Sequence, residues 1–426
     1  MLIYKKRLSL FPLLTLLLGG FSAAADELNS GDTAWILTAT ALVLMMSVPG
    51  LALFYGGMVR RKNILATVGQ SFASAIVISL IWVIVGYSLA AGEGNAYIGD
   101  FSMVFLKHLT LEGSNGSLPE SLFITFQMTF AIITAAIITG AFADRMKFSS
   151  FLIFISIWSI VVYSPVWHWV WGGGFLSNDG VLDYAGGTVV HITAGVSGLV
   201  AAIIIKPRYR FGKENMAPDN LAYTLIGGSL LWVGWFGFNA GSAVAADGSA
   251  GMAILVTQIA AAAGGFWWTA CEWAIRNKPS ILGMASGVVA GLVGITPASG
   301  FVDPMGALFI GSMTSIGCFF ASTSLKNKLK YDDSLDAFGI HGIGGLIGAV
   351  LTGVFAKEAI GGTKGALEGN LYQVWLQIEG VIATIVISVI GTAVILYAIK
   401  ATIGLRVTKE EEIEGLDQTI HGETIH

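Results

Sequence analysis

"GGTVVHITAG", residues 186–195, is an apolar stretch of small residues with a histidine near its centre. "DAFGIHGIGG", residues 336–345, has the same character and holds a second such histidine. Small residues follow both His191 and His341 at +3, +4 and +7, namely Ala194, Gly195 and Gly198 in the first stretch and Gly344, Gly345 and Gly348 in the second. These offsets lie on one face of a helix. Each histidine is therefore predicted to lie on a stripe of small residues, where another helix can approach closely.

The composition around these two stretches indicates a membrane protein. Of the 426 residues, 54% are hydrophobic and only 12% are charged, whereas a soluble domain has about 25% charged residues. Apolar runs of about 20 residues, long enough to cross a bilayer as a helix, recur along the chain. We therefore expect an all-α polytopic membrane protein with eleven transmembrane helices. The predicted spans are 33–58, 63–91, 121–142, 148–170, 187–205, 219–243, 250–275, 281–297, 304–323, 336–356 and 374–402.

Residues 1–25 have the pattern of a secretory signal peptide. A basic start at Tyr4 to Arg7 precedes an apolar run from Leu8 to Phe21, and small residues at Ser22 to Ala25 precede Asp26. This three-part pattern predicts cleavage, and an uncleaved first span is the alternative. The remaining chain is expected to divide into a transmembrane domain, residues 26–403, and a polar cytoplasmic C-terminal tail, residues 404–426.

Basic residues are distributed asymmetrically between the predicted spans. Loops and the tail that follow odd-numbered spans hold 17 Lys and Arg residues, whereas loops after even-numbered spans hold only Lys107, Lys357 and Lys364. Lys and Arg favour the cytoplasmic side of a membrane. This bias predicts an N-terminus outside and a C-terminus in the cytoplasm, as the signal peptide does independently.

The two histidine stretches fall in predicted spans five and ten. An aspartate lies eight residues before each histidine, Asp183 before His191 and Asp333 before His341. This recurrence predicts that spans 1–5 and 6–10 are duplicated halves, with an eleventh helix added. Because five is odd, the second half would enter the membrane from the opposite side. Transporters commonly contain such inverted repeats and place their substrate path at the repeat interface, so the histidines are expected to meet there.

A pair of buried histidines suggests a particular kind of chemistry. An ionisable side chain inside a span indicates function by default, although a satisfied structural role is the alternative. A neutral imidazole has one donor and one acceptor nitrogen. Two such rings can share a hydrogen bond and still present a nitrogen to a lumen, which suits a small neutral molecule or a proton relay. A metal site would need carboxylates or thiols nearby, and the small-residue stripes supply none.

Aromatic residues near the predicted outer ends of the spans have two interpretations. Phe126 and Phe130 are four residues apart in span three, Trp171 ends span four, and Trp235 and Phe238 share a face of span six. They could be packing or interfacial residues. A Trp beside Phe rings at an outer mouth could also bind a cation through cation–π attraction of about 0.5–2 kcal/mol. Asp183 similarly fits either a helix cap or a group that favours a nearby cation.

At these residues the chain resembles the ammonium transporter (Amt/Mep/Rh) family, and most closely its bacterial Amt branch. The resemblance covers roughly residues 33–420, and the joint occurrence of its motifs in this order is highly specific. The motifs are "PGLALFYGGMVRRKN", "FQMTFAIIT", "WGGGFL", "DYAGGTVVHITAG", "GWFGFNAGSA", "DDSLDAFGIHG" and "GLDQTIHGE".

The resemblance implies a role for each matching residue. His191 and His341 match the twin histidines of the family's pore. The other implied positions are an outer ammonium recruitment site at Trp171 and Ser242 with Phe126 and Phe130 beside it, a stacked gate of Phe130 and Phe238, and Asp183, which stabilises the recruitment site.

The resemblance also implies a mechanism and partners. Ammonium would be recruited at the outer mouth and deprotonated, and ammonia would pass the histidine-lined hydrophobic pore while the proton moves separately. Methylammonium is a further candidate substrate. The family assembles as a homotrimer with one pore per subunit, and its C-terminal tail docks a PII-type regulatory protein. For this chain, the resemblance to the bacterial branch implies a location in the cell inner membrane. A generic solvated tail is the alternative for residues 404–426.

Two other classes of function are alternatives to transport. One is an ammonium sensor or receptor that passes little substrate. The other is a membrane-embedded enzyme that uses the histidines with Asp183 or Asp336, but no nucleophile or metal triad accompanies them. We therefore expect no catalytic residues, cofactor or metal, and no nucleic-acid partner.

Overall fold

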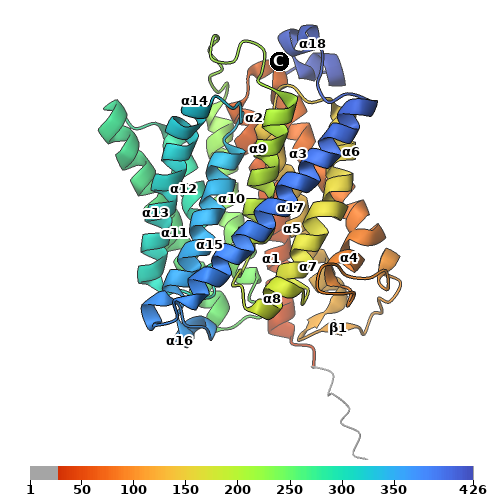
Figure 1. The fold of residues 1–426 in the computed structure, drawn as a ribbon, viewed down its shortest axis with the longest axis vertical. Coiled ribbons are helices and arrows are strands. Elements are labelled where there is room, and N and C mark those ends of the chain that lie inside the picture. The colour runs from red at the N-terminus through yellow and green to blue at the C-terminus, as the bar shows by residue number, and fades with distance from the viewer. Residues whose placement is uncertain (1–26, 426) are drawn as a thin grey trace, which may run out of the picture.

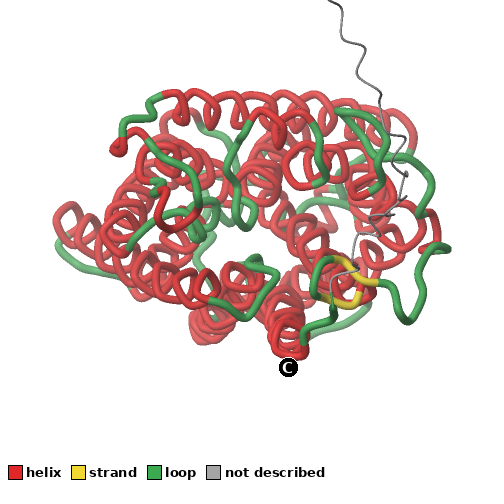
Figure 2. Tube along the Cα trace, turned by 90° about the horizontal axis from the view of Figure 1, so that it is seen from below, coloured by secondary structure: helices red, strands yellow, loops and turns green. Residues whose placement is uncertain are grey.

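The computed structural model describes residues 27–425, so the expected signal peptide lies outside the described residues. The described chain is a bundle of helices (Figure 1), and Figure 2 shows many of them nearly end-on. The α-helices are α1 Ser30–Met45, α2 Ala52–Met58, α3 Ile64–Ile81, α4 Tyr87–Ala91, α5 Glu120–Phe142, α6 Phe148–Trp158, α7 Ser164–Trp171, α8 Phe175–Asp179, α9 Thr193–Ile205, α10 Leu221–Gly241, α11 Gly248–Arg276, α12 Ile281–Ile295, α13 Pro304–Phe320, α14 Lys326–Leu329, α15 Ile343–Phe355, α16 Glu358–Gly361, α17 Tyr372–Thr402 and α18 Lys409–Glu414.

Short elements complete the described chain. Three 3₁₀ turns occupy Arg61–Asn63, Val104–Leu106 and Ala366–Glu368. Strands β1, Ser114–Asn115, and β2, Leu118–Pro119, form an antiparallel hairpin. This hairpin precedes α5 at the edge of the bundle (Figure 2).

Ten helical segments of the described chain are long and apolar enough to cross a membrane. They correspond to ten of the eleven predicted spans. The predicted eighth span is helix α12, which is apolar but has only 15 residues. The chain after α12 leaves the regular helix at Thr296 and Pro297, so this segment is shorter than the prediction of residues 281–297.

Several long helices are interrupted by π-helical turns, which often mark functional positions. Two of these turns contain the predicted histidines: Gly187–Ile192 contains His191, and Phe338–Gly342 contains His341. The remaining π-helical turns are Met46–Leu51, Trp82–Gly86, Ser159–Tyr163, Ala321–Leu325 and Asp417–His421.

The two histidine helices run in opposite directions. Figure 1 places α8, which precedes the helix of His191, at the lower end of the bundle, and α14, which precedes the helix of His341, at the upper end. We call the end with α14 and α18 the C-terminal face and the end with α8, α16 and β1 the opposite face.

Small residues bring these two helices into backbone contact, as their spacing predicts. A Cβ atom at Gly195 would collide with the backbone of Gly342, and one at Gly345 would press on His191 and the carbonyl of Gly187. Neither glycine can be replaced without pushing the two helices apart. The close approach places both histidine rings at the crossing.

Candidate functional site

Five rings form a row through the interior of the bundle. The indole of Trp171 meets Phe130 edge-on at 5.9 Å between ring centroids, and Phe130 stacks on Phe238 at 4.3 Å. Phe238 is followed by His191 at 6.0 Å, and His191 by His341 at 5.2 Å. The row therefore joins three of the aromatic residues that the sequence singles out to both histidines.

The two histidines contact each other directly. Their Nδ1 atoms are 3.2 Å apart, and both side chains are buried. Because two bare nitrogen lone pairs would repel at this distance, one ring must donate a proton to the other. The structure thus brings together the pair that the sequence predicts.

A small cavity lies beside the histidine pair. Its volume is about 10 Å³, which is close to the minimum that one water-sized molecule needs. Apart from the histidines and the indole of Trp235, its wall is made of apolar side chains. The lining residues are Met46, Leu51, Phe54, Ile133, Ile137, His191, Leu231, Trp235, Phe238, Val289 and His341.

A larger cavity of about 310 Å³ lies on the other side of the stacked phenylalanines. None of the residues that line it is charged. Aromatic rings make up much of its wall, and the amide of Gln127 and the hydroxyl of Ser242 provide oxygen atoms. The lining residues are Phe123, Gln127, Phe130, Trp167, Val170, Trp171, Tyr184, Ser242 and Val244.

The predicted recruitment residues take different positions around this cavity. Trp171 and Ser242 line it, and the Ser242 hydroxyl donates a hydrogen bond to the carbonyl of Phe238 at 2.9 Å. Phe126 is buried behind Phe130, which it meets edge-on at 5.0 Å, and is not among the residues of the cavity wall. Its contact with the cavity is therefore through Phe130.

The carboxylate of Asp183 points toward the start of its own helix rather than into the cavity. It accepts hydrogen bonds from the backbone N–H groups of Gly186, Gly187, Thr188 and Val189, and from the Thr188 hydroxyl. Its backbone carbonyl accepts the indole N–H of Trp171 at 2.7 Å. The geometry matches the capping interpretation, and it links Trp171 to the helix that holds His191.

Asp333 plays the corresponding part for the other histidine. Its carboxylate accepts the backbone N–H groups of Ala337, Phe338 and Gly339, at the start of the turn that contains His341. Burial raises the pKa of this carboxyl group to about 6, although Lys326 opposes the shift. Each histidine helix thus begins at a buried aspartate that lies eight residues before its histidine, as the sequence spacing predicts.

Sequence reasoning missed two polar residues of the site. Thr296 lies between His191 and Trp235, and its Oγ1 is 3.2 Å from Nε2 of His191. Gln127 accepts the indole N–H of Trp167 at 3.0 Å. A polar residue inside an otherwise apolar span could have indicated Gln127, but no spacing rule connects Thr296 to a histidine 105 residues away.

The C-terminal tail packs against the C-terminal face. The carboxylate of Asp417 accepts the backbone N–H groups of Leu65 and Ala66 at 3.1 and 2.8 Å, and Asn63 accepts the N–H of Leu416. The tail is therefore an ordered part of the described structure and not a fully solvated segment.

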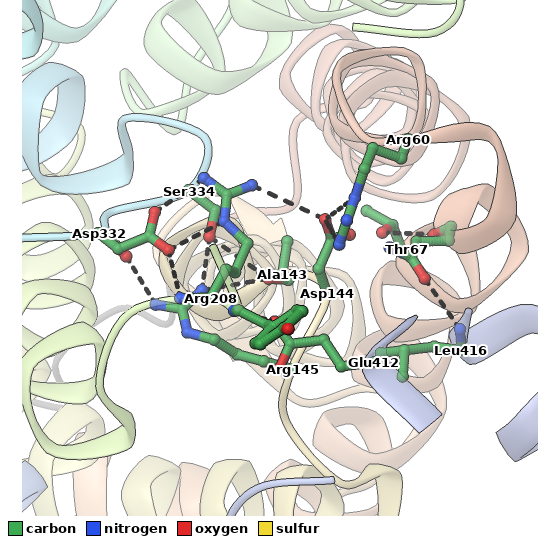
Figure 3. A network of polar contacts seen from close by, with 12 residues as sticks. Arg60, Thr67, Ala143, Asp144, Arg145, Arg208, Asp332, Ser334, Glu412 and Leu416 are labelled. Atoms are coloured by element: carbon green, nitrogen blue, oxygen red, sulfur yellow. Dashed lines mark hydrogen bonds and ion pairs between the residues drawn. The ribbon is translucent and has the colours of Figure 1, made fainter. Parts of the chain in front are cut away.

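Buried ion pairs stabilise the C-terminal face, against which the tail packs. Arg208 pairs with Asp332 at 2.7 Å and lies 3.7 Å from Asp144 (Figure 3). Arg145 is fully buried and donates to backbone carbonyls and to the Ser334 hydroxyl. The network joins loops that are far apart in sequence and holds the face on which the tail rests.

Comparisons with known proteins agree with this architecture. The model described as the Ammonium Transporter Family matches residues 34–426. The ammonium transporter of Aquifex aeolicus (strain VF5) is 51% identical over 403 residues, which cover 94% of each chain. The crystal structure of Saccharomyces cerevisiae Mep2 superposes with a TM-score of 0.85 at 36% identity, over 90% of this chain and 89% of Mep2.

A solved structure titled Sensor Amt Protein is also similar, with a TM-score of 0.85 at 30% identity over 92% of this chain and 98% of that one. Sequence and fold likeness thus extend over nearly the whole chain. The resemblance seen in the motifs is confirmed by the family model and by these relatives. The chain belongs to the ammonium transporter family, and it is a membrane transporter rather than an enzyme.

Proposed function

We propose that the protein recruits the ammonium ion at the larger cavity and conducts ammonia past the histidine pair, with the proton moved separately. The wall of the larger cavity can bind a small cation weakly, because it offers aromatic faces and oxygen atoms but no charged side chain. Aromatic faces attract a cation by about 0.5–2 kcal/mol each, and the oxygens of Gln127 and Ser242 can accept its N–H hydrogens. Weak binding of this kind concentrates the ion and still lets it leave.

The stacked pair of Phe130 and Phe238 separates the two cavities and acts as the gate. An ion that enters the small cavity must shed its hydration shell between two buried rings. A charge in the middle of a membrane costs several kcal/mol by insertion scales. Ammonia avoids this cost, whereas potassium cannot lose its charge by releasing a proton. Deprotonation therefore provides the selectivity that ion size cannot.

The direct contact between His191 and His341 in a lumen with otherwise apolar walls carries this proposal. The pair offers imidazole nitrogens to ammonia beside a cavity of only about 10 Å³, which is too small for a hydrated ion. Both rings are buried and form no ion pair with an acidic residue among residues 27–425, which favours their neutral forms. Neutral imidazoles can accept and donate hydrogen bonds to ammonia and can also carry the proton.

The finer architecture follows the same proposal. Ten long apolar helices and the shorter α12 make eleven crossings, and the opposed histidine helices with their paired aspartates support inverted five-helix halves. The C-terminal face, which collects most of the basic loop residues, is then cytoplasmic, and the larger cavity opens outside the cell inner membrane. Three subunits would assemble, each with its own pore, and the tail would dock a PII-type protein.

An ammonium sensor with little flux is the second candidate, because the Sensor Amt Protein shares this fold. Purified protein in liposomes separates the two functions. Because ammonia and its proton both cross in the proposed mechanism, a transporter gives a current down an ammonium gradient that increases in proportion to protein content. Binding of ammonium without a protein-dependent flux would establish the sensor instead.

A further inference from the structure

Thr296 holds a central place in the hydrogen bonds around the histidine pair. The indole N–H of Trp235 donates to its Oγ1 at 2.9 Å, and Nε2 of His191 lies 3.2 Å from the same atom. The Thr296 hydroxyl is itself 2.8 Å from the carbonyl oxygen of Leu292. All of these groups are buried, and two of them, Trp235 and His191, line the small cavity.

The donors and acceptors of this chain can be assigned in order. The indole N–H of Trp235 is only a donor, and the carbonyl of Leu292 is only an acceptor. The hydroxyl has one proton, and the shorter contact gives that proton to the carbonyl. Oγ1 then has two lone pairs left, one for Trp235 and one for His191. Nε2 of His191 must therefore be the protonated nitrogen of that ring.

This assignment fixes the second ring as well. A neutral His191 with its proton on Nε2 has a bare lone pair on Nδ1, so the proton shared between the rings belongs to Nδ1 of His341. Nε2 of His341 is then unprotonated. It has no hydrogen-bond partner within the described residues 27–425, and its ring lines the small cavity.

We infer that Thr296 is a positioning residue that sets the tautomers of the histidine pair, an inference that rests on the proposed conduction of ammonia. In this arrangement Nε2 of His341 is the free proton acceptor of the pair. His191 is the oriented partner, and His341 is the ring that accepts a hydrogen from ammonium or ammonia. The two histidines therefore have different roles although their sequence settings are alike. The reverse arrangement would leave the Leu292 carbonyl without the hydroxyl and present an N–H donor to the lumen.

Solid-state NMR of full-length protein in lipid bilayers, with ¹⁵N-labelled histidine, tests the assignment. The pair is recognised by its mutual Nδ1–Nδ1 correlation. We expect His191 to be protonated at Nε2 and His341 at Nδ1. In Thr296→Val, which lacks the acceptor, the ratio of His191 tautomers should shift by about tenfold, the change expected for one net hydrogen bond. Thr296→Ser should restore the wild-type ratio.

Thr384→Val provides the matched control, because Thr384 is also buried and also donates to a carbonyl four residues earlier, but lies on α17. Its spectrum should equal that of the wild type. The inference would be overturned if the wild-type protein were protonated at Nδ1 of His191, and this result does not depend on whether Thr296→Val folds. An unchanged tautomer ratio in a folded Thr296→Val protein would also overturn it. Failure of ammonium flux in the wild type would instead refute the proposed function while the tautomers are still measured.

Discussion

At the scale of single residues, the stacking of Phe130 on Phe238 divides the path into two cavities. The ring centroids are 4.3 Å apart, and neither side chain is exposed beyond 1%. The position of this stack between the two cavities is the reason why we propose that the two rings form a gate.

Phe238→Ala removes one ring of this stack and joins the two cavities. We expect ammonium flux in liposomes to change by several-fold, with partial admission of larger or hydrated cations. Because deletion of a buried Phe costs about 3–5 kcal/mol wherever it lies, Phe319→Ala serves as control: Phe319 is buried against Trp268, away from the lumen. Equal flux in Phe238→Ala and wild type would make Phe238 a packing residue.

Much of the site could be predicted at this scale, and some could not. His191 and His341 were recognisable because a titratable ring is rare on an apolar stripe and occurs twice in equivalent settings. Thr296 was not, since threonine is common in membrane helices and only the fold brings it to the ring. Phe126 was expected beside the recruitment site, and the structure adds that it meets Phe130 edge-on and is not among the residues of the cavity wall.

At the scale of elements, two buried aspartates begin the histidine helices. Asp183 satisfies four backbone N–H groups that would otherwise have no partner at the start of a helix. The spacing of eight residues predicted that Asp183 and Asp333 are equivalent. It could not tell a cap from a cation ligand, because both uses need the same carboxylate.

Asp183→Ala should destabilise the protein by about 3 kcal/mol, because a buried donor left without a partner costs about 1–3 kcal/mol. It should also reduce flux by releasing both the His191 turn and Trp171. The measurements are thermal unfolding in detergent and liposome flux. Asp179→Ala, at an exposed end of α8, should leave both unchanged. Normal stability of Asp183→Ala would show that the hydrogen bonds to this carboxylate are unimportant.

The C-terminal tail is the second element with a testable role. Deletion of residues 404–426 removes α18 and the Asp417 contacts to α3, but no residue of either cavity. We expect the truncated protein to conduct ammonium and to lose binding of a PII-type protein in a pull-down. Glu410→Gln, an exposed change on α18, should keep both activities. Capture of the PII-type partner by the truncated protein would refute the docking role.

At the scale of the whole molecule, the fold was predictable because a membrane restricts the choices. Length and hydropathy gave all eleven apolar segments within a few residues. The shortness of α12 was not predicted, because its last residues before Pro297 are as apolar as those of a regular span. Long-range order such as the Arg208–Asp332 network also escaped prediction, since charge pairing between distant loops leaves no local pattern.

The orientation predicted from the basic residues can be measured separately. A reporter fused after His426 should be active on the cytoplasmic side, and the mature chain should begin near Asp26 outside. Selective labelling of intact cells and N-terminal sequencing check these two points. An externally accessible C-terminal reporter would reverse the assignment of the faces, and an intact Met1 would show that the signal peptide is not cleaved.

Selective deprotonation at the histidine pair is most directly tested by currents across a bilayer with ammonium or potassium as the only cation. Wild-type protein should give ammonium current and exclude potassium. His191→Ala leaves His341 without its partner and should abolish ammonium current, whereas His191→Asp places a fixed negative charge in the lumen and should admit potassium. If both variants keep ammonium current and still exclude potassium, the histidines are structural and selectivity lies elsewhere.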